Sequence, residues 1–339
     1  MLTIQQIEAT PEFWERVARM PEHIIYQTRP WMEFLAETQG ASPVWGEVRD
    51  GTTVVGYFFG LTFQRMGVRI LGSPFPGWTT IYQGFCLESG TPRWQALEAL
   101  SRFAFHELGC LHFEIVDRYL TADDGDRLGL QYGWVDSYKH DLEKEEEQLF
   151  KEMNSACRRC IRKAEKTGLT VEEATPEGFA AEYYDQLKEV FLKQGLVPTY
   201  DQGRVEALIR HLHPTGNLLL LRARDPEGAG IATGIYPGLN QVAQFWGNAS
   251  YGSGQQYRPN EALHWQAMRY WKQRDVKVFD WGGGGTYKEK YGCTPIRVPW
   301  FRKSRYPGME QMRGLAQNMV QTSLRIRGRW KERATPEPK

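Results

Sequence analysis

The sequence lacks the short motifs that mark several large enzyme classes. It contains no G-x-S-x-G nucleophile elbow, no G-x-G-x-x-G loop after a strand and no G-x-x-x-x-G-K-[ST] phosphate loop. The seven histidines show no H-x-x-x-H spacing, and Cys293 has no histidine partner by motif. These absences disfavour serine and cysteine hydrolases, dinucleotide-dependent enzymes, P-loop nucleotidases and zinc enzymes, so we expect no metal site.

The sequence also has few cysteines and no long apolar run. Its five cysteines form no paired framework, which is typical of a reducing compartment. No stretch of about 18 apolar residues is present, and the opening MLTIQQIEATPEFWERV carries charges where a signal peptide needs apolar residues. The formal net charge of +1 argues against a nucleic-acid binder held by bulk charge, although a local basic face remains open. We therefore expect a cytoplasmic globular protein.

The 339 residues, 41% hydrophobic, are enough for two domains with sizeable cores. One order of expected elements occurs twice: strand, turn, strand, strand, loop, helix, strand. In the first unit these are strands at 44–48, 53–62 and 68–71, a helix at 91–108 and a strand at 111–116. In the second unit they are strands at 217–223, 229–236 and 241–248, a helix at 260–273 and a strand at 276–281. The repetition predicts an internal duplication and an α/β (α+β) fold with two lobes.

A polar stretch at 143–148 leads into a long expected helix that ends near Lys166. Its small or apolar side chains fall on one helical face, which includes Cys157 and Cys160, so the C-x-x-C is interpreted as packing and not as a redox or metal site. Arg158 and Arg162 lie on the other side, four residues apart. Two neighbouring guanidinium groups suit a phosphate, whereas the alternative is a solvated basic face balanced by nearby glutamates.

A glycine-rich segment, FDWGGGGTYKEKYG, covers residues 279–292. A strand is expected to end at Asp280 or Trp281, and Gly282 and Gly283 follow it. Glycines allow a ligand to approach the backbone closely, and open α/β sheets hold ligands where strands end. A lysine beside such a loop neutralises a phosphate or a developing oxyanion, which makes Lys288, next to Tyr287, a candidate. The alternative is that the glycines form a flexible hinge.

The third candidate is the loop at 73–82, which contains Trp78 and Tyr82 between prolines and glycines. Prolines restrict the backbone and aromatic rings give rigid contact area. The loop is therefore either a preformed wall of a substrate groove or an aromatic plug between the lobes.

Two of these segments together resemble the Fem-like branch of the GNAT acyltransferases, which includes the Fem peptidoglycan aminoacyltransferases and the CelD-like proteins of polysaccharide biosynthesis. The helix C-R-R-C-I-R-K-A-E-K-T-G-L at 157–169 is similar to the R-x-x-I-R-x-A-x-x-x-G-[VL] signature of that family. The segments F-D-W-G-G at 279–283 and Y-K-E-K-Y-G at 287–292 are similar to its F-K-x-x-F-G pattern. The resemblance covers roughly residues 10–305.

The resemblance implies two tandem GNAT-like lobes, each with a mixed twisted sheet flanked by helices, at 1–145 and 146–306. It implies an enzyme in which an amine or hydroxyl of a cell-envelope precursor or polysaccharide attacks an activated ester or thioester. Lys288 would then stabilise charge at the acyl-transfer site and Arg158 would lie near a phosphate of the acceptor. Asp280 would orient the amine or serve structurally. The other expected substrate contacts are Arg162, Trp78, Tyr82, Gly282, Gly283 and Tyr287.

The donor remains open at this stage between aminoacyl-tRNA and acyl-CoA. Ordinary GNAT enzymes bind coenzyme A pyrophosphate on a [QR]-x-x-G-x-[GA] loop that begins a helix. The matching segment at 255–262 lacks those glycines, and Pro259 removes an amide donor. This departure favours aminoacyl-tRNA or an unusual acyl donor. The competing hypotheses are an exopolysaccharide acyltransferase that uses acyl-CoA and a noncatalytic binding protein that kept the fold.

The segment at 307–339 is expected to form an amphipathic helix followed by a polar tail. The default expectation is a helix that packs on the second lobe with a solvated basic end. The alternative is peripheral contact with anionic lipid at the inner face of the membrane.

Overall fold

The computed structural model describes residues 1–65, 67–306 and 308. Within these ranges the strands form one 14-stranded sheet that runs through two lobes, with the order β1-β2-β3-β4-β6-β14-β7-β13-β11-β10-β9-β8, while β5 pairs with β3 and β12 with β10. The expected C-terminal helix and its lipid contact lie outside the described residues. In the part of the chain that is described, no helix is long and apolar enough to cross a membrane.

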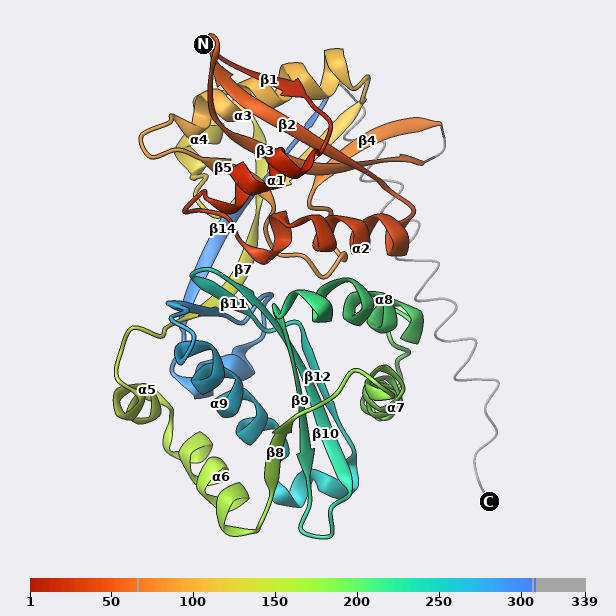
Figure 1. Ribbon diagram of the computed structural model, residues 1–339, viewed down its shortest axis with the longest axis vertical. Helices are drawn as coiled ribbons and strands as arrows, with labels where there is room; N and C mark the ends of the chain where they lie inside the picture. The colour runs from red at the N-terminus through yellow and green to blue at the C-terminus, as the bar shows by residue number, and fades with distance from the viewer. Residues whose placement is uncertain (66, 307, 309–339) are drawn as a thin grey trace.

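The first lobe begins at the N-terminus and is drawn in red to yellow in Figure 1. Its strands are β1 (Leu2–Gln6), β2 (Ser42–Asp50), β3 (Thr53–Arg65), β4 (Val68–Ser73), β5 (Gly84–Leu87) and β6 (His112–Val116). Its helices are α1 (Pro11–Ala18), α2 (Arg29–Gln39), α3 (Arg93–Arg102) and α4 (Ala122–Asp126), with short turns η1 (Ile25–Gln27) and η2 (Phe103–Glu107). The turn expected between the strands at 44–48 and 53–62 joins β2 to β3, and Gly51 provides its positive φ of +59°.

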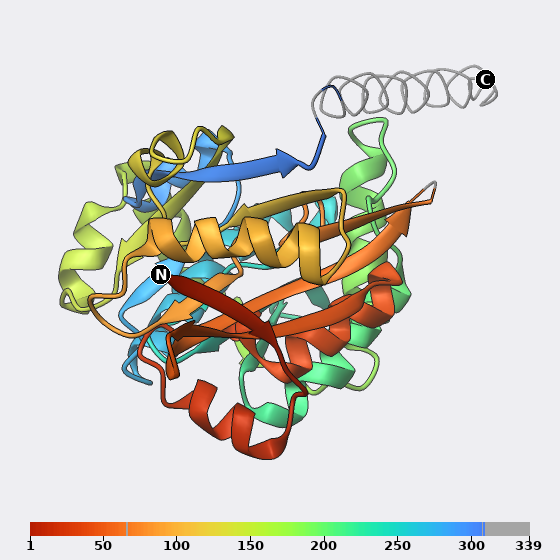
Figure 2. The same cartoon turned by 90° about the horizontal axis from the view of Figure 1, so that it is seen from above.

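The two faces of the first-lobe sheet are covered by different helices. Side chains alternate along β3, so Phe58 packs with α3, whereas Phe59 packs with α1 and α2. Figure 2 shows α3 lying across the strands of this lobe. The cluster around Phe59 continues into the second lobe, where it includes Val205 and Leu208 of α8. The lobes therefore share a core and are fixed against each other.

The second lobe repeats the same order of elements. Its strands are β8 (Thr170–Glu173), β9 (Leu218–Arg224), β10 (Gly230–Leu239), β11 (Val242–Gln244), β12 (Gly247–Ser250) and β13 (Val278–Asp280). Its helices are α5 (Glu146–Glu152), α6 (Ser155–Lys166), α7 (Phe179–Leu192), α8 (Gln202–Leu212) and α9 (Pro259–Lys272), with turns η3 (His213–Thr215), η4 (Gly252–Tyr257) and η5 (Thr286–Tyr291).

The strands that join the lobes are β7 (Gln131–Asp141) and β14 (Thr294–Ser304), neither of which the sequence analysis predicted. β14 lies between β6 and β7 and pairs with both in antiparallel fashion. β7 in turn pairs with β13 of the second lobe. Figure 1 shows both strands running from one lobe to the other. The last described strand thus completes the first-lobe sheet.

The expected long helix ending near Lys166 is wrong in one respect, because it is broken into α5 and α6. Met153 takes an extended conformation, and the Asn154 side chain then caps α6 by accepting a hydrogen bond from the amide of Cys157 at 2.8 Å. Asparagine is a strong N-cap residue because its side-chain oxygen satisfies an otherwise unpaired amide. As predicted, Cys157 lies on the buried face of α6, while Cys160 is only partly buried.

Candidate functional site

The carboxylate of Asp280 lies fully buried where β13 ends, at the junction of the lobes. Its Oδ2 accepts a hydrogen bond from the Tyr82 hydroxyl at 3.0 Å, and its Oδ1 accepts from the Ser137 hydroxyl at 2.6 Å and from the Gly282 amide at 2.9 Å. Tyr82 comes from the loop of the first lobe, Ser137 from β7 and Asp280 from β13. A buried carboxylate is tolerated when its lone pairs are satisfied in this way. Asp280 therefore joins three elements that are distant in the sequence.

Burial and the negative charge of Asp280 together raise the pKa of the Tyr82 hydroxyl well above its usual value. The phenol consequently remains protonated and donates to the carboxylate. Ser137 was missed in the sequence analysis because β7 was not predicted. No local motif marks it, since its role depends on the pairing of β7 with β13.

The glycine-rich segment forms a turn that is held by the hydrogen bonds of Lys288. Gly282 and Gly283 have φ values of +54° and +56°, a left-handed conformation that residues with a side chain adopt at a cost. The Lys288 ammonium donates hydrogen bonds to the carbonyl oxygens of Trp281 at 2.9 Å, of Gly283 at 3.1 Å and of Gly282. An ammonium has three donors, and all three are engaged here. The geometry thus supports a fixed loop and not a free hinge.

The Lys288 side chain is only 4% exposed. Burial lowers its pKa to about 8, because the charged form loses hydration, although the negative charge of Asp280 opposes this shift. Tyr287 beside it is 51% exposed, and its ring centroid lies 5.8 Å from Lys288 Nζ. The loop therefore presents an exposed aromatic ring next to a buried lysine of lowered basicity.

The loop at 73–82 lies against the core and against the second lobe, and its expected role as a groove wall stays a prediction. Trp78 is buried and its ring packs against Phe75 and Phe63, with centroid distances of 4.9 and 5.9 Å. Farther along the loop, the Thr79 hydroxyl accepts a hydrogen bond from Arg204 of α8 at 3.1 Å. Trp78 therefore belongs to the aromatic core, while Tyr82 reaches the buried carboxylate of the second lobe.

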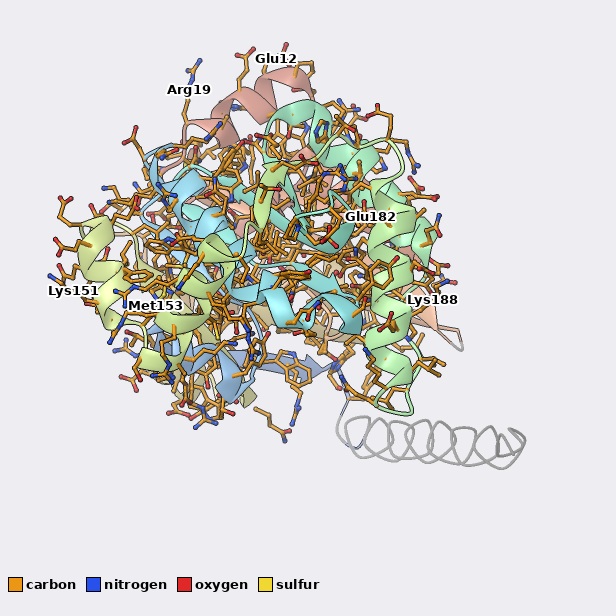
Figure 3. The ribbon with its side chains drawn as sticks, turned by 90° about the horizontal axis from the view of Figure 1, so that it is seen from below. Glu12, Arg19, Lys151, Met153, Glu182 and Lys188 are labelled. Carbon is orange, nitrogen blue, oxygen red and sulfur yellow. The ribbon has the colours of Figure 1, made fainter. Side chains whose placement is uncertain are left out.

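Arg158 and Arg162 are not brought to this carboxylate by any interaction within the described residues. Arg158 donates hydrogen bonds to the backbone carbonyl of Lys151 at 2.6 Å and to that of Met153, at the C-terminal end of α5. Both acceptor residues are labelled in Figure 3. Arg162 is exposed and lies over the Phe150 ring at 5.3 Å. The carbonyl groups at a helix end are natural partners for arginine. The contacts of Arg158 are those of a residue that stabilises the α5–α6 connection.

A second feature of the site is the separation of β11–β12 from β13. β11 pairs with β13 only as far as Gln244 and Asp280, and β12 pairs with β10 alone. Between the separating strands lies an aromatic group in which Trp281 contacts Phe245, His264 and Tyr291, with centroid distances of 5.9, 4.9 and 4.5 Å. Burial lowers the pKa of His264 to about 3, so it is neutral there.

The start of α9, next to this separation, offers few amide donors. Pro259 occupies the first helical turn and Arg258 at the N-cap has φ +60° and makes no side-chain capping bond. The Asn260 side chain accepts from Asn248 at 3.0 Å. Proline has no N–H, so this helix start provides a poorer cradle for a pyrophosphate than a glycine-rich one. Within the described ranges, no group of three or more metal-ligating side chains is assembled.

Comparison with protein families gives one match, to an acetyltransferase (GNAT) domain over residues 151–291. Among solved structures, FemX matches with a TM-score of 0.71 at 15% identity, covering 87% of this chain and 96% of that one. A tandem GNAT protein from the clavulanic acid biosynthesis pathway matches at TM-score 0.54 and 12% identity, with coverages of 91% and 100%. L-PGS from Bacillus licheniformis matches at TM-score 0.54 and 12% identity, with coverages of 92% and 98%. No curated protein sequence matches significantly.

The structural matches are at identities that establish the fold alone. They confirm the predicted mixed α/β fold of tandem GNAT-like lobes, with the addition that β7 and β14 join the lobes in one sheet. The domain match confirms the predicted GNAT acyltransferase superfamily for the second lobe.

Proposed function

Residues 151–291 belong to the acetyltransferase (GNAT) family within a chain that has the fold of FemX, and from this premise we propose an acyl- or aminoacyltransferase of the cell envelope. An amine, or a hydroxyl, of an envelope precursor or polysaccharide attacks an activated ester or thioester directly. The N–C or O–C bond forms as the bond to the donor's oxygen or sulfur breaks, and the departing group takes up the proton that the attacking group loses. We place this reaction in the cytoplasm.

The observation that carries the proposal is the junction of Tyr82 and Asp280 beside the loop held by Lys288. These groups form a buried, hydrogen-bonded polar cluster at the end of β13, within the GNAT domain and against the other lobe. No side-chain nucleophile is required, because the donor is already activated and holding the reactants together supplies much of the acceleration. In this proposal Lys288 stabilises the oxyanion by exchanging one of its carbonyl partners for the substrate, while Gly282, Gly283 and Tyr287 line the approach.

For the donor we propose an aminoacyl-tRNA in preference to acyl-CoA. The supporting observations are Pro259 at the start of α9 and the aromatic contacts of Trp281, the residue after β13, with Phe245, the residue after β11. The GNAT match of residues 151–291 favours the second candidate, an exopolysaccharide acyltransferase that uses acyl-CoA.

Thermal-shift titration distinguishes these donors, because a ligand that binds the native state alone raises the melting temperature. The purified chain would be titrated with acetyl-CoA, longer acyl-CoAs, aminoacyl-tRNA and UDP-linked peptidoglycan precursors. Product formation by mass spectrometry would follow for each donor that binds, with Lys288→Ala as the inactive control. Stabilisation by acyl-CoA alone would select the second candidate. Binding without product for every donor and acceptor pair would contradict both.

A further inference from the structure

A row of polar side chains crosses four neighbouring strands beside Asp280. The register pairs Gln244 of β11 with Asp280, Asp280 with Lys139 of β7, and Lys139 with Thr294 of β14. Residues that are register partners point to the same face of a sheet, so the four side chains share one face. Gln244 and Asp280 are fully buried, Lys139 is partly buried and Thr294 is exposed. The row thus leads from the interior to the solvent.

Lys139 is a cation without a partner in this row. Among the described residues, its ammonium makes no hydrogen bond or ion pair, and it lies 5.6 Å from the centroid of the Tyr82 ring. The adjacent Asp280 already accepts three hydrogen bonds from other groups. Lys288, in contrast, has all its donors engaged with loop carbonyls. The lysine with free donors at this site is therefore Lys139.

Arg118 adds a second unpaired cation. It follows β6, close to the loop of Tyr82, since the amide of Gln83 donates to the carbonyl of Val116 at 3.0 Å. Within the described part of the chain its guanidinium forms no ion pair or hydrogen bond and its Nε is buried without a hydrogen-bond partner, while the guanidinium carbon lies 5.1 Å from the centroid of the Tyr119 ring. Burial and the like charge of Arg118 both lower the pKa of Lys139, whereas Asp280 raises it. A partly buried cation that makes no direct ion pair loses hydration without a compensating contact, so an anion that contacts it would stabilise its charged form.

Gln244 has the same lack of partners at the inner end of the row. Both its amide nitrogen and its amide oxygen are buried without a hydrogen bond among the described residues. Buried amide groups are nearly always hydrogen-bonded in proteins. The row therefore contains one cation and one amide without hydrogen-bonding partners, and Arg118, which follows β6, lies outside the row.

We propose that Lys139 and Arg118 form an anion subsite at the lobe junction that binds a phosphate or diphosphate group of the acceptor. A guanidinium and an ammonium on different elements suit an anion with several acceptor oxygens, which a diphosphate provides. The Tyr82 ring lies beside the ammonium, and the exposed end of the row at Thr294 gives the ligand access. The assignment of the anion to the acceptor rests on the proposed function, whereas the binding site itself does not.

Titration calorimetry with inorganic pyrophosphate at low ionic strength tests the subsite without any need for catalysis. The variants are Lys139→Met and Arg118→Gln, and the matched control is Lys303→Met, a partly buried strand lysine at the other end of β14 that makes no ion pair within the described ranges. We expect each site variant to weaken pyrophosphate binding about tenfold or more, because a charge-assisted contact is lost, and the control to bind as the wild type does.

A second measurement, the melting temperature, distinguishes a loss of binding from a loss of folding. Since burial lowers the pKa of Lys139 and so disfavours its charged form in the folded state, Lys139→Met should melt at a temperature equal to or above that of the wild type when no anion is present. Equal loss of binding in the control, or no pyrophosphate binding by the wild type, would overturn the subsite. Uridine diphosphate and an isoprenyl diphosphate in detergent form further arms of the titration. Tighter binding of one of them identifies a nucleotide-linked or a lipid-linked acceptor. Diphosphate binding without transfer activity would count against the proposed function alone.

Discussion

The Tyr82 hydroxyl donates a hydrogen bond to Asp280 Oδ2 at 3.0 Å, across a sequence separation of 198 residues. Because the two residues lie in different lobes, this contact reports directly on how the lobes fit together. Tyr82→Phe keeps the ring and removes only the donor, which leaves a buried carboxylate with one partner fewer. We expect a loss of about 1–3 kcal/mol of unfolding free energy, measured by urea denaturation.

Tyr306→Phe, at a tyrosine that is 54% exposed, controls for the change from tyrosine to phenylalanine. It should leave the stability within experimental error. A Tyr82→Phe variant as stable as this control would show that Asp280 does not depend on the hydroxyl.

Lys288 gives a pH dependence for the proposed transfer. Its pKa of about 8 is lowered by burial, so the ammonium loses its proton as the pH rises through 8. The rate should therefore fall above about pH 8, since the neutral amine loses the charge that stabilises an oxyanion. The rate would be measured from pH 6.5 to 9.5 in parallel for Lys288→Arg, in which the guanidinium stays charged. This variant should lose the alkaline decline, whatever its absolute rate. An identical decline in both enzymes would assign it to another group.

The lowered pKa of Lys288 also makes the unfolding free energy depend on pH, with a sign opposite to that of the rate. Between about pH 8 and the usual lysine pKa, the unfolded chain holds a proton on residue 288 that the folded chain does not hold. The contribution of this group to the unfolding free energy therefore rises with pH across that window. Comparison of denaturation curves at pH 7.5 and 9.5 for the wild type and Lys288→Met isolates the effect. The difference between the two proteins should change with pH, and a constant difference would contradict the assigned pKa.

Gly282 and Gly284, two glycines of the same loop, provide a matched test of whether the turn conformation requires glycine. At Gly282, φ is +54° and an added Cβ would approach two Ile81 side-chain carbons at 3.1 Å. At Gly284 the φ is not in the left-handed region and the nearest atom to an added Cβ lies at 4.0 Å. Gly282→Ala should cost about 1–2 kcal/mol, because an L-residue is strained in that conformation. Gly284→Ala should be close to neutral. Thermal unfolding of both variants makes the comparison, and equal costs would show that the turn conformation is not what requires glycine.

Arg158 either stabilises the connection between α5 and α6 or contacts a phosphate of the acceptor, and two variants distinguish these roles. It donates to carbonyls at the end of α5, so Arg158→Ala should lower the melting temperature, whereas Arg162→Ala removes an exposed side chain and should have little effect. The expected cost for Arg158 is about 1 kcal/mol, a typical net value for hydrogen bonds of this kind. If Arg158→Ala instead leaves stability unchanged and weakens acceptor binding, the residue contacts the acceptor's phosphate, as the Fem-like resemblance implies.

Local signals in the sequence predicted the elements whose cause is local. The turn signal Asp50-Gly51 explains the expected turn between β2 and β3, and the helix expected at 260–273 is observed as α9, close to its expected bounds. The break between α5 and α6 could also have been predicted, since Asn154 is a strong capping residue in front of an apolar-periodic segment.

The junction between the lobes could not be predicted in this way. β7 and β14 owe their places to pairing with strands far away in the sequence. Lys139 and Ser137 consequently had no reason to be singled out, although Asp280 and Lys288 did. The glycine segment identified one wall of the candidate site, while the opposite wall depended on tertiary register that periodicity does not encode.

The position of β14 also affects how the chain reaches its native state during synthesis. The partner of β6 on one side is a strand near the end of the described chain, so most of the first lobe leaves the ribosome before its sheet can be completed. Until residues 300–304 arrive, β6 presents an unpaired edge, which is a site for wrong pairing with another chain. Cutting the chain between the lobes would leave the same edge, so a fragment that ends near residue 145 should aggregate. A circular permutant that starts with β14 and joins it to the first lobe would supply the missing strand early in translation.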